Sequence, residues 1–101
     1  MALTNSQRFA ALVRSFPVMA YAPTGSVRED AVNLLALDAW AAREDPDGRE
    51  GILPTVQFLL NVWSRSHQWQ VGRFDLFRAL EAWDTEQLAA FQRWAAAPWR
   101  P

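Results

Sequence analysis

The chain has 101 residues, of which half are apolar and none is cysteine. A chain of this length fits one domain with a core of its own, so we expect a single domain over residues 1–101. The lack of cysteine excludes disulfides and thiolate metal sites. Ten arginines, no lysine and eleven carboxylates give a net charge of −1, which argues against a dedicated nucleic-acid or membrane-surface binder.

The N-terminal residues and the most apolar stretch indicate where the protein works. Residues 1–8 lack a basic segment followed by an apolar run, so we expect no secretory signal. Residues 31–42 are too few for a membrane span and are interrupted by Asn33 and Asp38. We therefore expect a cytoplasmic protein that does not contact a membrane.

A first helix is predicted from about Asn5 to Phe16, because Thr4 and Gln7 have the spacing of a capping box. Its apolar stripe consists of Phe9, Leu12, Val13 and Phe16. Pro17 ends this helix. The connector that follows, residues 17–25, is apolar for a loop, so we expect it to lie across the core.

A second helix is predicted to begin at a capping box formed by Ser26 and Glu29 and to end near Arg43. Apolar residues lie on nearly all sides of this helix, and Leu37 and Trp40 share one of them. Either neighbouring elements surround the helix, or the Leu37 and Trp40 side meets a partner.

Residues 44–51 form a polar, turn-rich loop, which we expect to be the most mobile segment. Asp45, Asp47 and Gly48 superficially resemble part of a calcium-binding loop. If Gly48 took the required glycine position, Arg43 would stand at the first ligand and Pro54 at the bidentate glutamate. The pattern fails, and we predict no metal site.

Three helices are predicted after this loop, and the first two of them lie before Asp84. One begins near Pro54 or Thr55, and its apolar stripe consists of Val56, Leu59, Leu60 and Trp63. The chain then turns around residues 66–72. The next helix covers about Arg73 to Trp83, and we expect four of its side chains to point inward: Leu76, Phe77, Leu80 and Trp83.

The last helix is predicted over Thr85 to Ala96. Asp84 and Gln87 have the spacing of a capping box, and Trp83 and Leu88 stand at the positions of a hydrophobic staple. Because the helices are short and their connectors uneven, we predict an all-α fold, a compact orthogonal bundle of four to five short helices.

Few residues suggest catalysis. His67 is the only histidine, and Ser64 and Ser66 lie close to it in sequence, but nothing indicates an orienting carboxylate or an oxyanion hole. A role for His67 at the end of the third helix is the favoured interpretation. We expect Asp38 to pair with an arginine such as Arg14 or Arg78. We therefore predict a protein that is not an enzyme and needs no cofactor.

A small DNA-binding regulator is one alternative. The third and fourth helices would form a helix-turn-helix, with stacking by Trp69 or Trp99. The phosphate contacts would come from Arg65, Arg73, Arg78 and Arg93. Carboxylates interleave with these arginines, at Asp75, Glu81 and Glu86, and the intervening turn is long, so nucleic acid is the less favoured partner.

Protein binding is the leading hypothesis, because six tryptophans, six phenylalanines and the arginines are residue types enriched at interfaces. The candidate docking residues are Leu37, Trp40, Trp69, Trp99 and Arg100. For Trp40 the alternative is cover by the connector, and for Trp99 it is packing back onto the bundle. We expect a non-catalytic protein-protein interaction module, acting as an adaptor, an inhibitor or a homo-oligomer.

The C-terminal half resembles a pattern in small helical proteins of unknown function from bacterial mobile elements. The residues that carry the resemblance are 58–63, Phe74-Asp75-Leu76 and Ala79-Leu80. The resemblance implies no activity and no catalytic residue. It adds one alternative function, a phage or mobile-element inhibitor of a host nucleic-acid-handling defence complex.

Overall fold

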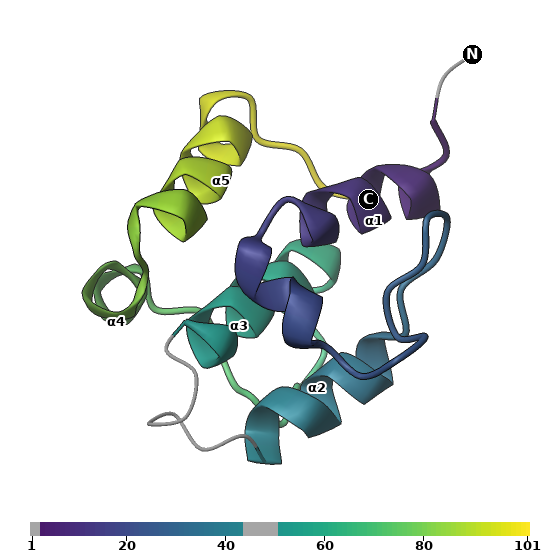
Figure 1. Ribbon diagram of the computed structural model, residues 1–101, viewed down its shortest axis with the longest axis horizontal. Coiled ribbons are helices and arrows are strands. Elements are labelled where there is room, and N and C mark those ends of the chain that lie inside the picture. The colour runs from purple at the N-terminus through teal and green to yellow at the C-terminus, as the bar shows by residue number, and fades with distance from the viewer. Residues whose placement is uncertain (1–2, 44–50) are drawn as a thin grey trace.

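The computed structural model describes residues 3–43 and 51–101, and these residues contain helices and no β-strand. The elements are α1 (Asn5–Arg14), a 3-10 helix η1 (Pro17–Tyr21), α2 (Leu34–Arg43), α3 (Ile52–Trp63), α4 (Leu76–Ala82) and α5 (Thr85–Ala96) (Figure 1). Figure 1 looks nearly along α4 and across α2, so these two helices cross steeply. The predicted all-α class and the orthogonal arrangement are confirmed.

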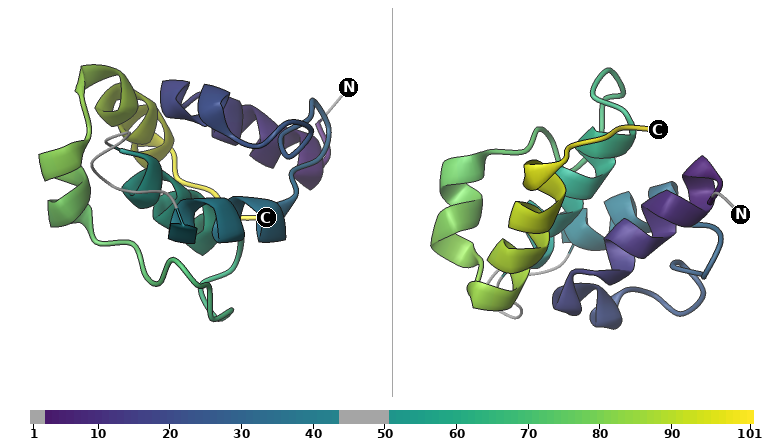
Figure 2. Two further views of the ribbon diagram at one scale, coloured as in Figure 1. Left: turned by 60° about the horizontal axis from the view of Figure 1, so that its bottom comes forward. Right: turned by 90° about the horizontal axis from the view of Figure 1, so that it is seen from above.

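Helix α3 is the central element of the core. It packs against α2, α4 and η1, and the two views of Figure 2 show it enclosed between the other helices. Its buried residues lie on most of its circumference: Ile52, Thr55, Val56, Phe58, Leu59, Leu60 and Val62. A helix this apolar requires neighbours on several sides, which the surrounding short helices provide.

The start of α1 and the connector after it agree with the sequence. The Thr4 hydroxyl accepts from the Gln7 backbone N–H at 3.1 Å, and the Gln7 amide oxygen accepts from the Thr4 N–H at 3.0 Å. This capping box fixes the first turn. In the connector, Val18 and Met19 are buried, and η1 packs against α1, α3 and α5. The connector therefore lies across the core, as predicted.

The predicted start of the second helix is wrong. Ser26 is buried, and its hydroxyl donates to the Pro23 carbonyl at 2.6 Å instead of capping a helix. Residues 26–33 form a loop closed by an isolated bridge between Val27 and Val32. Helix α2 begins only at Leu34, where the Asn33 side chain accepts from the Ala36 N–H at 3.0 Å. Asn33 thus takes the role predicted for Ser26.

The predicted inward face of the fourth helix is largely wrong. Helix α4 begins after Asp75, whose carboxylate accepts from the N–H groups of Phe77 and Arg78. Phe77 is 79% exposed, and Leu76 and Leu80 are exposed as well. The fully buried residue of α4 is Ala79, whose small side chain allows close approach of the neighbouring helix α3. Of the four predicted inward residues, Trp83 alone is buried.

Helix α5 has the predicted bounds, and Asp84 is its N-cap. One carboxylate oxygen of Asp84 accepts from the N–H groups of Glu86 and Gln87. The Gln87 side chain also donates to the same carboxylate at 2.7 Å. In a capping box this side chain would instead accept from the backbone N–H of Asp84, so only one of the two predicted bonds is present.

None of the helices in the described ranges has both the length and the apolar character that a membrane crossing requires.

Candidate functional site

An aromatic cluster lies where α3, α4 and α5 meet. The Phe58 ring of α3 is at its centre, with five other ring centroids 5.0 to 6.3 Å away. Those rings belong to Phe16, Phe74, Trp83, Phe91 and Trp94. Most of the pairs with Phe58 meet edge to face, the geometry that aromatic quadrupoles favour.

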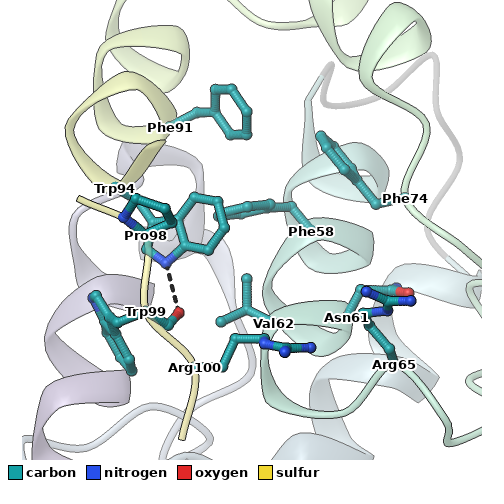
Figure 3. A pocket seen from close by; sticks show the side chains of 10 residues that line it. All are labelled: Phe58, Asn61, Val62, Arg65, Phe74, Phe91, Trp94, Pro98, Trp99 and Arg100. Atoms are coloured by element: carbon teal, nitrogen blue, oxygen red, sulfur yellow. Dashed lines mark hydrogen bonds between the residues drawn. The ribbon is translucent and has the colours of Figure 1, made fainter. Parts of the chain in front are cut away.

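The cluster opens to the surface on one side, in a cleft of about 650 Å³. Its lining consists of Phe58, Asn61, Val62, Arg65, Phe74, Phe91, Trp94, Pro98, Trp99 and Arg100 (Figure 3). Phe58 and Val62 are buried at its floor, whereas Arg65 and Arg100 are exposed at its rim. Figure 3 shows the Arg100 side chain extending from the C-terminal tail toward α3, where Arg65 and Asn61 lie. The cleft therefore combines an apolar floor with cationic donors.

Two contacts hold the C-terminal tail against the bundle. The indole Nε1 of Trp94 donates to the backbone carbonyl of Trp99 at 3.1 Å. On α1, the guanidinium carbon of Arg8 lies 4.1 Å from the centroid of the Trp99 ring, a cation–π geometry. Trp99 thus folds back onto the bundle while remaining half-buried, and it forms one wall of the cleft.

A second, smaller hollow of about 300 Å³ lies on the other side of the tail. Its lining consists of Arg8, Ala11, Leu12, Ser15, Ala90, Arg93, Trp94 and Trp99. Trp94 and Trp99 line both hollows, so the two indoles form a ridge between them. Four arginines surround this ridge, and no described carboxylate lines either hollow.

The predicted docking residues are distributed over three places. Leu37 and Trp40 are buried, with exposures of 0% and 8%, so the predicted surface on the second helix is part of the core. Trp69 is half-buried away from the cleft, where its Nε1 donates to the Ser64 carbonyl at 3.0 Å. Trp99 and Arg100 are brought together in the cleft.

Sequence reasoning did not assign Phe58, Phe74, Phe91 and Trp94 to a binding site. Phe91 and Trp94 are three residues apart on α5, a spacing that places them on one side of the helix. That spacing was the available signal. Nothing in the sequence indicated that this side of α5 would leave the α3 aromatics partly uncovered.

The residues considered for chemistry, His67 and Asp38, each have defined contacts in the described ranges. The His67 ring packs against Trp69, with centroids 4.1 Å apart, and no hydrogen bond joins it to Ser64 or Ser66 there. The arginine partner expected for Asp38 is wrong. Asp38 is buried and accepts from the backbone N–H groups of Gln70 and Val71, each at 3.0 Å.

The residues considered for metal and DNA binding can be compared with the described part of the chain. No group of three or more potential ligands that could hold a metal ion occurs in residues 3–43 and 51–101. The calcium pattern at Asp45 and Asp47 lies outside these residues. Of the four arginines expected along a helix-turn-helix, Arg65 lines the cleft and Arg93 the smaller hollow, while Arg73 and Arg78 line neither.

Comparison of the chain with family models, with curated proteins and with solved structures finds no match. The similarity of the C-terminal half to mobile-element proteins therefore stays a prediction.

Proposed function

We propose that this chain is a non-catalytic protein-binding module and that the aromatic cleft is its docking site. The observation that carries the proposal is the opening of the Phe58 cluster to the surface between α3, α5 and the tail. Its volume of about 650 Å³ is large enough to accept bulky side chains of a partner. Tryptophan and arginine at its edge are the residue types that dominate binding energy at protein interfaces.

The polar groups of the cleft favour binding over catalysis. They are the guanidinium groups of Arg65 and Arg100 and the amide of Asn61. A guanidinium stays protonated in proteins, and an amide does not transfer protons at neutral pH. The Asn61 amide is also used structurally, because it donates to the carbonyls of Gln57 and Gly72. These groups can orient a ligand but supply neither a general base nor a nucleophile.

The tail contacts support a preformed site. A binding wall that is already ordered loses less conformational entropy when a partner docks. The Trp94 hydrogen bond to the Trp99 carbonyl and the Arg8 contact to the Trp99 ring provide this order. The biological setting of the partner, including inhibition of a host nucleic-acid-handling defence complex, rests on the resemblance of residues 58–80 alone.

Two matched tryptophan variants test the proposal. Trp99 lines the cleft, and Trp69 is a half-buried tryptophan outside it, so Trp99→Ala and Trp69→Ala remove similar side chains. Tagged wild type and both variants, each with helicity confirmed by circular dichroism, are used to capture partners from native cells after nuclease treatment. We expect one dominant protein with the wild type and Trp69→Ala, and its loss with Trp99→Ala.

Equal capture of that protein by all three chains would remove the cleft as its docking site. Recovery of nucleic acid in place of protein when nuclease is omitted would contradict the protein-binding proposal itself.

A further inference from the structure

The charge around the Trp94–Trp99 ridge differs from that of the whole chain. The net charge of the chain is −1, yet the ridge is flanked by Arg65 and Arg100 on one side and by Arg8 and Arg93 on the other. No described carboxylate lines either hollow. The lining of the two hollows is therefore cationic, although the chain as a whole is nearly neutral.

The two arginines of the cleft have no evident structural role. Arg65 and Arg100 are exposed, and neither forms an ion pair or a side-chain hydrogen bond within the described part of the chain. Arg8, in contrast, contacts the Trp99 ring, and Arg93 lies in the last turn of α5, where a cation complements the helix dipole. The guanidinium groups of Arg65 and Arg100 thus keep their donors for a ligand, and they pair best with planar anions such as carboxylates.

We propose that the cleft recognises an acidic protein segment, in which one large apolar side chain is flanked by aspartate or glutamate. This inference rests on the proposed function and names its partner class. The apolar side chain fills the space over Phe58 and Val62, and the carboxylates meet Arg65 and Arg100 at the rim. Opposite charges at the rim speed association and select partners, while the apolar anchor supplies most of the affinity.

A protein segment fits these features better than a nucleic acid. Stacking on bases requires free aromatic faces. One face of Trp99 is covered by Arg8, and Trp94 packs against Phe58 at 5.0 Å. The four arginines are also divided between two hollows rather than aligned along one groove, as phosphate tracking would require.

The test selects peptides from a random phage-displayed library on immobilised wild-type protein. Selected peptides are synthesised, and their dissociation constants are measured by fluorescence anisotropy with the wild type, with Trp99→Ala and with two double variants. Arg65→Glu/Arg100→Glu reverses the charge at the cleft. Arg28→Glu/Arg78→Glu is the matched control, because both of its arginines are exposed and line neither hollow.

We expect the wild type to select peptides with a large apolar residue between acidic residues. Their affinity should fall at least about tenfold in Arg65→Glu/Arg100→Glu, should be nearly unchanged in the control, and should weaken with added salt. If the selected peptides are neutral or basic but bind Trp99→Ala more weakly than wild type, the cleft binds peptides without a preference for acidic ones. That result would overturn this inference and leave the proposed function standing. Peptides that bind Trp99→Ala as well as wild type would contradict both.

Parallel measurements test two other possible occupants of the cleft, a nucleic acid and a second copy of this chain. A fluorescent oligothymidine that binds the wild type more tightly than any selected peptide would overturn the inference in favour of nucleic acid. A second copy of this chain could present Phe77 and Leu80 beside Glu81 on α4, which is similar chemistry. A dimer in sedimentation equilibrium that dissociates in Arg65→Glu/Arg100→Glu would overturn the choice of a separate partner.

Discussion

The indole Nε1 of Trp83 donates a 2.8 Å hydrogen bond to the hydroxyl of Thr55, and both side chains are buried. The bond joins the first turn of α3 to the C-cap residue of α4. Trp83 also contacts Phe58 and Phe74, so this hydrogen bond helps to hold the buried side of the aromatic cluster in place. A buried indole N–H must be hydrogen-bonded, and Thr55 provides the acceptor inside an otherwise apolar core.

Replacement of Thr55 by valine keeps the shape of the side chain and removes the acceptor. We expect Thr55→Val to lower the free energy of unfolding by about 1–3 kcal/mol, because the Trp83 N–H is left buried without a partner. Urea denaturation measures this loss. In a Trp83→Phe background the same substitution should cost clearly less, and an equal cost in both backgrounds would show that the hydrogen bond is not its cause.

Asp38 connects α2 to the segment before α4. Its two carboxylate oxygens accept separately from Gln70 and Val71, so Asp38→Asn places an amide N–H₂ against one backbone donor. We expect a loss of about 1–3 kcal/mol in the free energy of unfolding. Asp30→Asn, at an exposed loop position, should change stability by less than about 0.5 kcal/mol. Similar losses for the two variants would contradict this role of Asp38.

Phe58 and Phe77 are chemically identical but differ in burial, being 3% and 79% exposed. We expect Phe58→Ala to cost about 3–5 kcal/mol, because it opens a cavity at the centre of the aromatic cluster. Phe77→Ala should stay within about 0.5 kcal/mol of wild type. Thermal unfolding of both variants checks the contrast, and a large loss for Phe77→Ala would mean that α4 is packed differently in solution.

Arg8 holds the C-terminal tail through the Trp99 ring. Arg8→Gln removes the cation–π contact, which is worth about 0.5–1 kcal/mol at exposed sites, so global stability should change little. The backbone of residues 98–100 should become more mobile, which ¹⁵N relaxation would show as lower order parameters. Arg93→Gln provides the control, because Arg93 lines the same hollow but makes no cation–π contact with the Trp99 ring within the described residues. Unchanged relaxation in Arg8→Gln would indicate that the Trp94 hydrogen bond holds the tail alone.

The features that the sequence predicted well depend on residues close together in the chain. The Thr4–Gln7 capping box and the Asp84 cap of α5 each involve a side chain and a backbone group within three residues. The all-α class follows from the helical spacing of apolar residues between such caps. Local capping hydrogen bonds can form in any tertiary context that permits a helix, and the spacing of apolar residues is a property of the sequence itself. Both can therefore be predicted without knowledge of the fold.

Competition between similar local signals was decided by the tertiary structure. Ser26 and Asn33 are both good N-cap residues, and packing selected Asn33 because Ser26 is buried in a turn with Pro23. On α4 the periodicity fitted an inward face of large residues, whereas the close approach to α3 required Ala79.

By itself the sequence determined the all-α class and the approximate position of each helix. It also showed that the chain has more large aromatic rings and arginines than one small core can bury. Only the tertiary structure decided that Leu37 and Trp40 would be buried while Trp99 and Arg100 would border a cleft. That cleft joins α3 to a tail more than thirty residues away in sequence, from Phe58 to Trp99. Contacts over such separations depend on how every helix packs, and no local pattern of residues encodes them.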